Sequence, residues 1–183
     1  MIRQELDTDR AERYIEAPPE ALYDIIADVT RTPELSPELK SCAWARGATG
    51  PSVGARFRAW NKVPGRPPWR NSPVVTVADR GREFAFSRTE LIGGTVVWRY
   101  LFTPEGSGTR VIESYEVIKP IPLIGWLGIG GIYGLKDRRS DLRRGMSATL
   151  ERLAVLVEQP TTAEQENQNS LIVTRESGSA AET

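Results

Sequence analysis

The stretch that decides the fold is LKDRRSDLRRGMSATLERLAVLVE, residues 135–158, because one side of it is apolar along its whole length. Its apolar residues recur at intervals of seven, four, four, three and four, which form one stripe on a helix of 3.6 residues per turn. The stripe consists of Leu135, Leu142, Met146, Leu150, Leu153 and Val157. A helix of about 24 residues spans roughly 36 Å. It therefore requires an equally long apolar surface to pack against.

Gly145 interrupts this helical pattern. A glycine inside a helix costs about 1 kcal/mol relative to alanine. One interpretation is tolerated sequence drift. The other is that the missing side chain leaves room in a space between the helix and the surface on which it packs.

Most of the chain upstream of this helix has the period-two pattern of β-strands. A first strand is expected over residues 9–17, and two short helices follow it at 20–29 and 32–35. Further strands are expected at 41–46, 54–62, 73–79, 83–91, 95–103 and 109–118, with a proline-rich loop at 63–73 that is too irregular for a strand. The short links indicate an antiparallel meander. The predicted fold is α+β: a curved seven-stranded antiparallel sheet around a long C-terminal helix, with two short helices between strands 1 and 2.

Composition excludes several classes of protein. The 183 residues carry 24 basic and 24 acidic side chains, so a general basic field for nucleic acid is absent, and we expect no nucleic-acid partner. The chain has no histidine and a single cysteine, Cys42, so we expect no metal site, no disulfide and no cofactor. No secretion signal and no transmembrane segment is visible, which favours a cytoplasmic setting.

The chain divides into three parts by composition. Residues 1–8 are polar and are expected to be flexible, and residues 9–158 form one domain. Residues 159–183 are polar with almost no aromatic side chains, which predicts a disordered tail.

Strand alternation gathers aromatic side chains on the face that meets the long helix. The residues predicted to contact a ligand on that face and on the helix are Phe57, Asn61, Phe84, Phe86, Arg88, Trp98, Tyr100, Tyr115 and Met146. Taken singly, each aromatic residue is explained by an ordinary core. As a set they exceed what a core behind a single helix needs, and aromatic walls with a few polar groups are typical of ligand pockets.

Several sequence motifs, in this order and spacing, resemble the START/SRPBCC superfamily, which has the helix-grip fold. They are APPEALYDIIADV in the first helix, VGARF at 53–57, GREFAF at 81–86, WRY at 98–100 and GTRVIESY at 108–115. Within the superfamily, residues 9–158 are most similar to the polyketide cyclase/dehydrase-like lipid-binding proteins of actinobacteria. The resemblance implies a deep apolar cavity between sheet and helix. It also implies a hydrophobic ligand such as a polyketide, a lipid or an isoprenoid.

Glu113 and Tyr115 are the candidate catalytic residues. A carboxylate that faces an apolar cavity is costly unless it pairs or meets a ligand. One interpretation of Glu113 is a structural ion pair with Arg88 or Arg99, or a water-exposed edge position. The other is an acid/base or hydrogen-bonding group in the pocket. The resemblance supplies no catalytic set that matches residue by residue, so an enzyme of the cyclase/dehydrase type is the alternative to a binding protein.

The apolar, glycine-rich segment KPIPLIGWLGIGGIYG, residues 119–134, links the last strand to the long helix. It is interpreted either as a buried linker under the helix or as a lid over the cavity. A third hypothesis is an interaction module in which Trp126 and Tyr133 contact a membrane surface or a protein partner.

Overall fold

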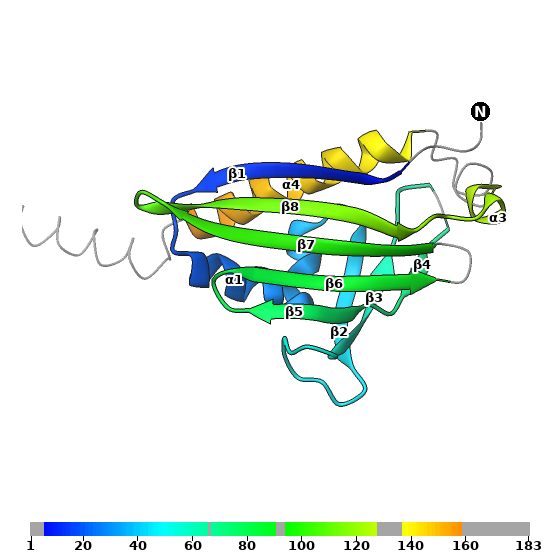
Figure 1. The fold of residues 1–183 in the computed structure, drawn as a ribbon, viewed down its shortest axis with the longest axis horizontal. Coiled ribbons are helices and arrows are strands. Elements are labelled where there is room, and N and C mark those ends of the chain that lie inside the picture. Colours follow the sequence, from blue (N-terminus) through cyan, green and yellow to red (C-terminus); the bar gives the residue numbers. More distant parts are fainter. Residues whose placement is uncertain (1–5, 66, 91–93, 128–136, 159–183) are drawn as a thin grey trace, which may run out of the picture.

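The structure is a computed structural model of the chain, and it describes residues 6–65, 67–90, 94–127 and 137–158. It contains one antiparallel sheet and a long C-terminal helix, α4 (Arg138–Glu158), which contacts β1 (Thr8–Ile15) and β8 (Gly108–Lys119). Figure 1 shows α4 running along the sheet beside β1, behind the sheet in that view. The predicted α+β helix-grip architecture is confirmed. The predicted first residues of the long helix, 135 and 136, lie outside the described residues.

The sheet has the order β1-β8-β7-β6-β5-β3-β2, and neighbouring strands run antiparallel. The remaining strands of this path are β2 (Leu39–Ala45), β3 (Arg56–Asn61), β5 (Val74–Asp79), β6 (Glu83–Glu90) and β7 (Gly94–Glu105). Their bounds all lie within two residues of the predicted ones.

An eighth strand, β4 (Trp69–Asn71), lies in the loop at 63–73 that was predicted to be too irregular for a strand. This prediction was wrong. Although prolines flank the segment, its three residues remain able to pair with β3, with Asn61 opposite Trp69 and Ala59 opposite Asn71.

Helix α1 (Pro19–Ala27) begins at a proline, which suits the first helical turn, and Glu20 lies near its positive end. The 3₁₀ helix η1 (Val29–Arg31) and α2 (Thr32–Leu35) follow. Helix α1 contacts β6, β7 and α4, and α2 contacts β2 and α4. These helices close the space between the sheet and α4 at one side.

The hairpin between β7 and β8 sets the register on which the site depends. Its turn places Glu105 opposite Gly108, and Gly106 adopts a φ of +61°, a conformation that glycine reaches without steric cost. Counting back from this turn, Tyr100 lies opposite Glu113 and Trp98 opposite Tyr115.

Part of the amino end, predicted to be flexible, takes part in the fold. Leu6 is buried, Thr8 begins β1, and the backbone N–H of Val117 donates a hydrogen bond to the carbonyl of Asp7. The predicted tail at 159–183 lies outside the described residues.

Candidate functional site

A cavity of about 120 Å³ lies between the sheet and α4. Its lining comes from β2, β3, β4, β6, β7, β8 and α4, and from the segment that contains α1, η1 and α2. The lining includes all the predicted ligand-binding residues except Tyr115, namely Phe57, Asn61, Phe84, Phe86, Arg88, Trp98, Tyr100 and Met146. The candidate catalytic residue Glu113 also lines the cavity.

The aromatic side chains of the wall contact one another in sequence. Phe86 packs edge-on against Phe57 with ring centroids 5.2 Å apart, and it lies 6.0 Å from Phe84. Edge-on and tilted arrangements are the favoured geometries for aromatic pairs. The wall is therefore an apolar surface of rings that pack against one another.

Gly145 faces this cavity from α4. No heavy atom would lie within 4 Å of a Cβ added at Gly145, apart from its own helical surroundings. One turn further along, Thr149 is buried and its hydroxyl donates a hydrogen bond to the Gly145 carbonyl over 3.0 Å. The structure thus favours the second interpretation of Gly145, in which the absent side chain leaves room.

Glu113 lies on β8 with only 3% of its surface exposed. The Tyr100 hydroxyl donates a hydrogen bond to Glu113 Oε1 over 2.8 Å, and the other oxygen, Oε2, is buried without a hydrogen-bond partner in the described part of the chain. A buried acceptor without a partner costs about 1–3 kcal/mol. Glu113 therefore presents an unsatisfied carboxyl oxygen in an apolar cavity.

Burial controls the protonation of this carboxyl group. It raises the pKa of Glu113 from 4.5 to about 8, against the lowering effect of the Tyr100 hydrogen bond. At neutral pH the group is mostly the neutral acid, which can donate a hydrogen bond as well as accept one. Burial, followed by the nearby Glu113, also raises the pKa of Tyr100 well above its usual value, so its hydroxyl keeps its proton.

The ion pair predicted for Glu113 as its structural alternative is not present among the described residues. Arg99 instead pairs with Glu83 over 3.1 Å, and Arg88 pairs with Glu90 over 3.6 Å. Glu113 is not at an exposed edge position either. The geometry thus matches the other interpretation, a hydrogen-bonding group in the cavity.

A second polar region of the lining is charged. Arg138, the first residue of α4, donates hydrogen bonds to both carboxylate oxygens of Glu38 over 2.6 and 2.9 Å. Arg88 lines the same cavity as Glu38 and Arg138, and the charges of both affect its pKa. We call Glu38, Arg88 and Arg138 the charged end of the cavity.

Tyr115 does not line the cavity, although it shares the inward face of β8 with Glu113. Its ring lies 5.5 Å from that of Trp98 and belongs to a separate group of buried side chains. This group, which we call the packed cluster, consists of Leu6, Val96, Tyr115, Ile121, Trp126 and Met146. The Tyr115 hydroxyl is buried without a hydrogen-bond partner in the described ranges. Tyr115 does not border the cavity, so the structure gives no support to its predicted ligand-binding and catalytic roles.

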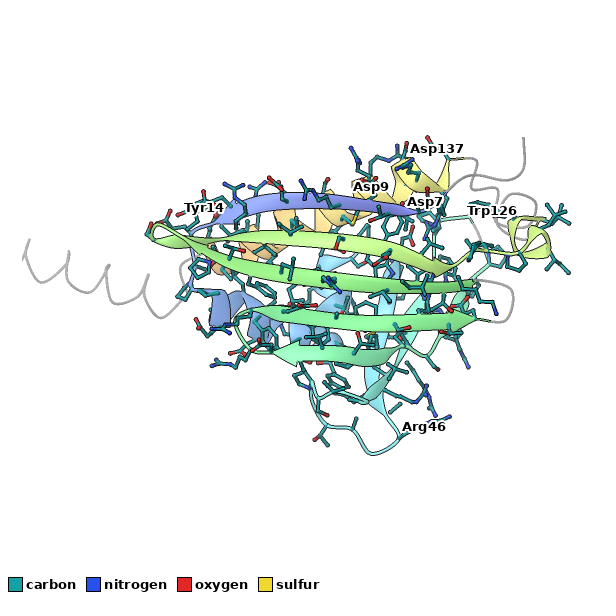
Figure 2. All side chains as sticks on the ribbon, in the orientation of Figure 1. Asp7, Asp9, Tyr14, Arg46, Trp126 and Asp137 are labelled. Atoms are coloured by element: carbon teal, nitrogen blue, oxygen red, sulfur yellow. The ribbon has the colours of Figure 1, made fainter. Side chains whose placement is uncertain are left out.

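Beside the packed cluster, an ion pair joins β1 to α4. Arg143 donates hydrogen bonds to both carboxylate oxygens of Asp9, and Figure 2 labels Asp9 on β1 beside the first turns of α4. The hydrogen bonds from Arg143 are the main cause that lowers the pKa of Asp9.

Sequence reasoning missed several lining residues. Cys42 lies in the lining, and burial raises the pKa of its thiol to about 12, so it stays protonated. Asn71, on the unexpected strand β4, has a buried Oδ1 without a partner in the described chain. Glu38 and Arg138 reach the cavity only through tertiary folding. A spacing of four residues from Gly145 would have placed Thr149 on the cavity side of the helix.

Segment 119–134 is described as far as residue 127, and its remainder, with Tyr133, lies outside the described residues. It contains the short helix α3 (Leu123–Leu127), which lies at the end of the sheet where β8 finishes (Figure 1). Trp126, labelled in Figure 2, is 2% exposed and packs inward, contrary to its predicted position at a membrane surface. Leu123, Ile124 and Leu127 of the same helix are exposed.

The described residues hold no group of three or more cysteine, aspartate or glutamate side chains placed to bind a metal ion. None of the helices within these ranges combines the length and hydrophobicity needed to cross a bilayer. What the cavity offers chemically is an apolar wall, the neutral acid of Glu113 with Tyr100, and a guanidinium at the charged end.

Solved structures with a similar fold cover most of the chain. Protein CV1439 from Chromobacterium violaceum matches with a TM-score of 0.62 and 17% identity, over 85% of this chain and all of that one. The structure of Ara h 8.0201 matches with a TM-score of 0.60 and 14% identity, over 84% of this chain and 98% of that one. The di-domain ARO/CYC BexL from the BE-7585A biosynthetic pathway matches with a TM-score of 0.60 and 16% identity, over 85% of this chain and 48% of that one. At these identities the likeness shows the fold.

No match was found among curated proteins. A family profile described as polyketide cyclase / dehydrase and lipid transport matches residues 10–158, which is most of the chain. The chain belongs to the polyketide cyclase/dehydrase and lipid transport family.

Proposed function

We propose that this protein binds a hydrophobic small molecule in the cavity between the sheet and α4. The observation that carries the proposal is the buried Oε2 of Glu113, which has no partner in the described chain and lies in a wall of aromatic side chains. Apolar burial would supply the affinity at about 25 cal/mol per Å². The neutral Glu113 carboxyl group would donate a hydrogen bond to an acceptor on the ligand, such as a ketone, quinone or ester oxygen.

The size and chemistry of the cavity support this proposal. An engineered apolar cavity of about 150 Å³ stays dry and binds benzene. The present cavity, about 120 Å³, is of that order and is partly open, so a ligand larger than benzene can extend out of it. It is also lined by more polar groups at defined positions. A ligand therefore has both a surface to cover and specific hydrogen-bonding groups to meet.

The test uses the neutral fluorophore N-phenyl-1-naphthylamine and the variant Gly145→Leu. The new leucine side chain enters the open space beside Gly145, so we expect probe affinity to fall at least about tenfold while the protein stays folded. Ser147→Leu places the same side chain on the exposed side of α4 and serves as the matched control. Equal affinity in all three proteins, or no binding by the wild type, would refute the proposal.

Catalysis of the cyclase/dehydrase type is the second candidate, and the raised pKa of Glu113 favours it. A carboxyl group with a pKa of about 8 is suited to accept or donate a proton near neutral pH. Glu113→Gln keeps the shape and hydrogen-bonding capacity of the side chain and removes proton transfer. If Glu113 is catalytic, turnover of a substrate identified by binding should be lost, whereas in a pure carrier binding should change only modestly.

A third prediction is peripheral contact with a membrane through α3. Its exposed side chains Leu123, Ile124 and Leu127 are of the type that enters the interface of a bilayer. Trp126 is not part of this surface, because it is anchored in the packed cluster.

A further inference from the structure

The charged end of the cavity points to a more specific ligand class than an apolar molecule, and this inference rests on the proposed binding function. We propose that the ligand carries an acidic group, a carboxylate or a similarly compact anion, which accepts hydrogen bonds from the Arg88 guanidinium.

Arg88 is directed to the cavity by the alternation of β6. Phe84, Phe86 and Arg88 occupy successive inward positions of the strand and all three line the cavity. The side chain of Arg88 is 23% exposed, so the guanidinium is partly removed from water. It is thus a cation placed where an apolar molecule would lie.

The protein leaves the hydrogen-bond donors of the Arg88 guanidinium largely without acceptors. Its ion pair with Glu90 Oε1 spans 3.6 Å, which is longer than a hydrogen bond, and it makes no hydrogen bond in the part of the chain that the structure describes. A guanidinium has five N–H donors in a planar fork that matches a carboxylate. Glu90 Oε1 is itself buried without a hydrogen bond in those ranges. The Arg88 donors are therefore available to a ligand.

Arg138 gives the contrast at the same end of the cavity. It holds Glu38 with two hydrogen bonds of 2.6 and 2.9 Å, a satisfied bidentate pair. Burial, which is the largest cause, lowers the pKa of Arg88, and the positive charge of Arg138 lowers it further against the opposing effects of Glu90 and Glu38. An anion bound at Arg88 would offset both unfavourable effects, and a neutral acceptor would offset them less well.

The distance between Arg88 and Glu113 also indicates how far apart the two polar groups of the ligand should be. Phe84 lies opposite Tyr100, which lies opposite Glu113, so these three residues form one row across β6, β7 and β8. Arg88 is four residues along β6 from that row, which corresponds to about 14 Å of strand. The acidic group and the acceptor that meets Glu113 would therefore occupy opposite ends of an elongated apolar ligand.

The test compares decanoate with decan-1-ol, which share a ten-carbon chain and differ in the head group. Each would be measured by displacement of N-phenyl-1-naphthylamine at pH 7 from the wild type and from Arg88→Met. Loss of a hydrogen bond to a charged group typically weakens binding tenfold or more. We expect decanoate to bind the variant at least about tenfold more weakly, with decan-1-ol changed by less than about twofold.

Two further variants control the interpretation. Arg99→Met removes an arginine from β7 that pairs with Glu83 and does not line the cavity, so it should leave both affinities unchanged. Arg88→Lys keeps the positive charge and should keep part of the preference for decanoate.

If folded Arg88→Met loses affinity equally for both compounds, or keeps its affinity for decanoate, the acidic-group proposal is wrong. The proposed binding of an apolar ligand in the cavity would be unaffected by that result. Failure of the wild type to bind the fluorophore would instead refute the proposed binding function itself.

Discussion

The inner face of β8 contributes to two regions that differ in how completely they are filled. At Glu113 the space between the sheet and α4 is open, and at Tyr115, two residues further on, it is filled by the packed cluster. Helix α4 makes the difference, because Gly145 offers no side chain to the open region, whereas Met146, which is 1% exposed and also lines the cavity, packs into the packed cluster. The comparison teaches that strand alternation identifies inward residues, and that the facing helix decides which of them meet a ligand.

The largest expected effect concerns the charge of Glu113 in the open region. Its pKa of about 8 in the folded protein exceeds the ordinary value of 4.5, so the folded state holds a proton that the unfolded chain has released. The unfolding free energy of the wild type should therefore fall relative to Glu113→Gln as pH rises from about 4.5 to 8, by a total on the order of 5 kcal/mol. Chemical denaturation of both proteins between pH 4 and 9 measures this difference. A difference that is independent of pH would show that Glu113 is not buried as described.

The packed cluster should respond to the loss of a side chain in the opposite way from the open region. Met146→Ala removes a buried side chain that packs in the packed cluster and borders the cavity, and such substitutions typically cost about 2–5 kcal/mol. Gly145→Leu, one residue away, fills an open space and replaces a residue that disfavours the helix by about 1 kcal/mol, so the unfolding free energy should stay unchanged or rise. Urea denaturation of both variants checks the contrast. Equal destabilisation by both would contradict the assignment of one region as open and the other as filled.

The two tyrosines allow a finer test of the same comparison. Tyr100→Phe removes the donor to Glu113 Oε1 and leaves that oxygen unsatisfied, so we expect a loss of about 1–3 kcal/mol. Tyr115→Phe removes a hydroxyl group that has no partner in the described ranges, so the unfolding free energy should be unchanged or slightly higher. The matched pair is compared by thermal and urea denaturation. A larger loss at Tyr115 would reveal a hydrogen bond that this account lacks.

The smallest effect on stability is expected in α3, where buried and exposed apolar residues alternate. Ile124→Asp changes an exposed side chain and should alter the unfolding free energy by less than about 0.5 kcal/mol, while it weakens any binding to anionic phospholipid vesicles. Cosedimentation with vesicles of phosphatidylcholine and phosphatidylserine is the measurement, and Lys40→Asp, on the exposed part of β2, is a control. Identical sedimentation of the wild type and Ile124→Asp would show that α3 does not contact the membrane.

Much of the cavity wall was predictable from local pattern, because alternation on β3, β6 and β7 placed Phe57, Phe86 and Tyr100 on the inward face. Other features depend on tertiary placement. Asn71 reaches the cavity through a strand of three residues, too short to show periodicity, and Arg138 reaches it by pairing with Glu38, 100 residues earlier in the chain. From the sequence, Trp126 could belong to a buried linker, to a lid or to a membrane-contacting surface, and only the fold reveals the cluster that buries it.

The most direct test of the central claim is native mass spectrometry of the purified wild type and Gly145→Leu, followed by extraction and identification of any bound molecule. The account predicts that the wild type carries a small apolar molecule and that the variant, whose leucine occupies the same space, has lost it. The same molecule at equal occupancy in both proteins, or none in either together with no binding of N-phenyl-1-naphthylamine by the wild type, would contradict the claim that the open region beside Glu113 is a ligand site.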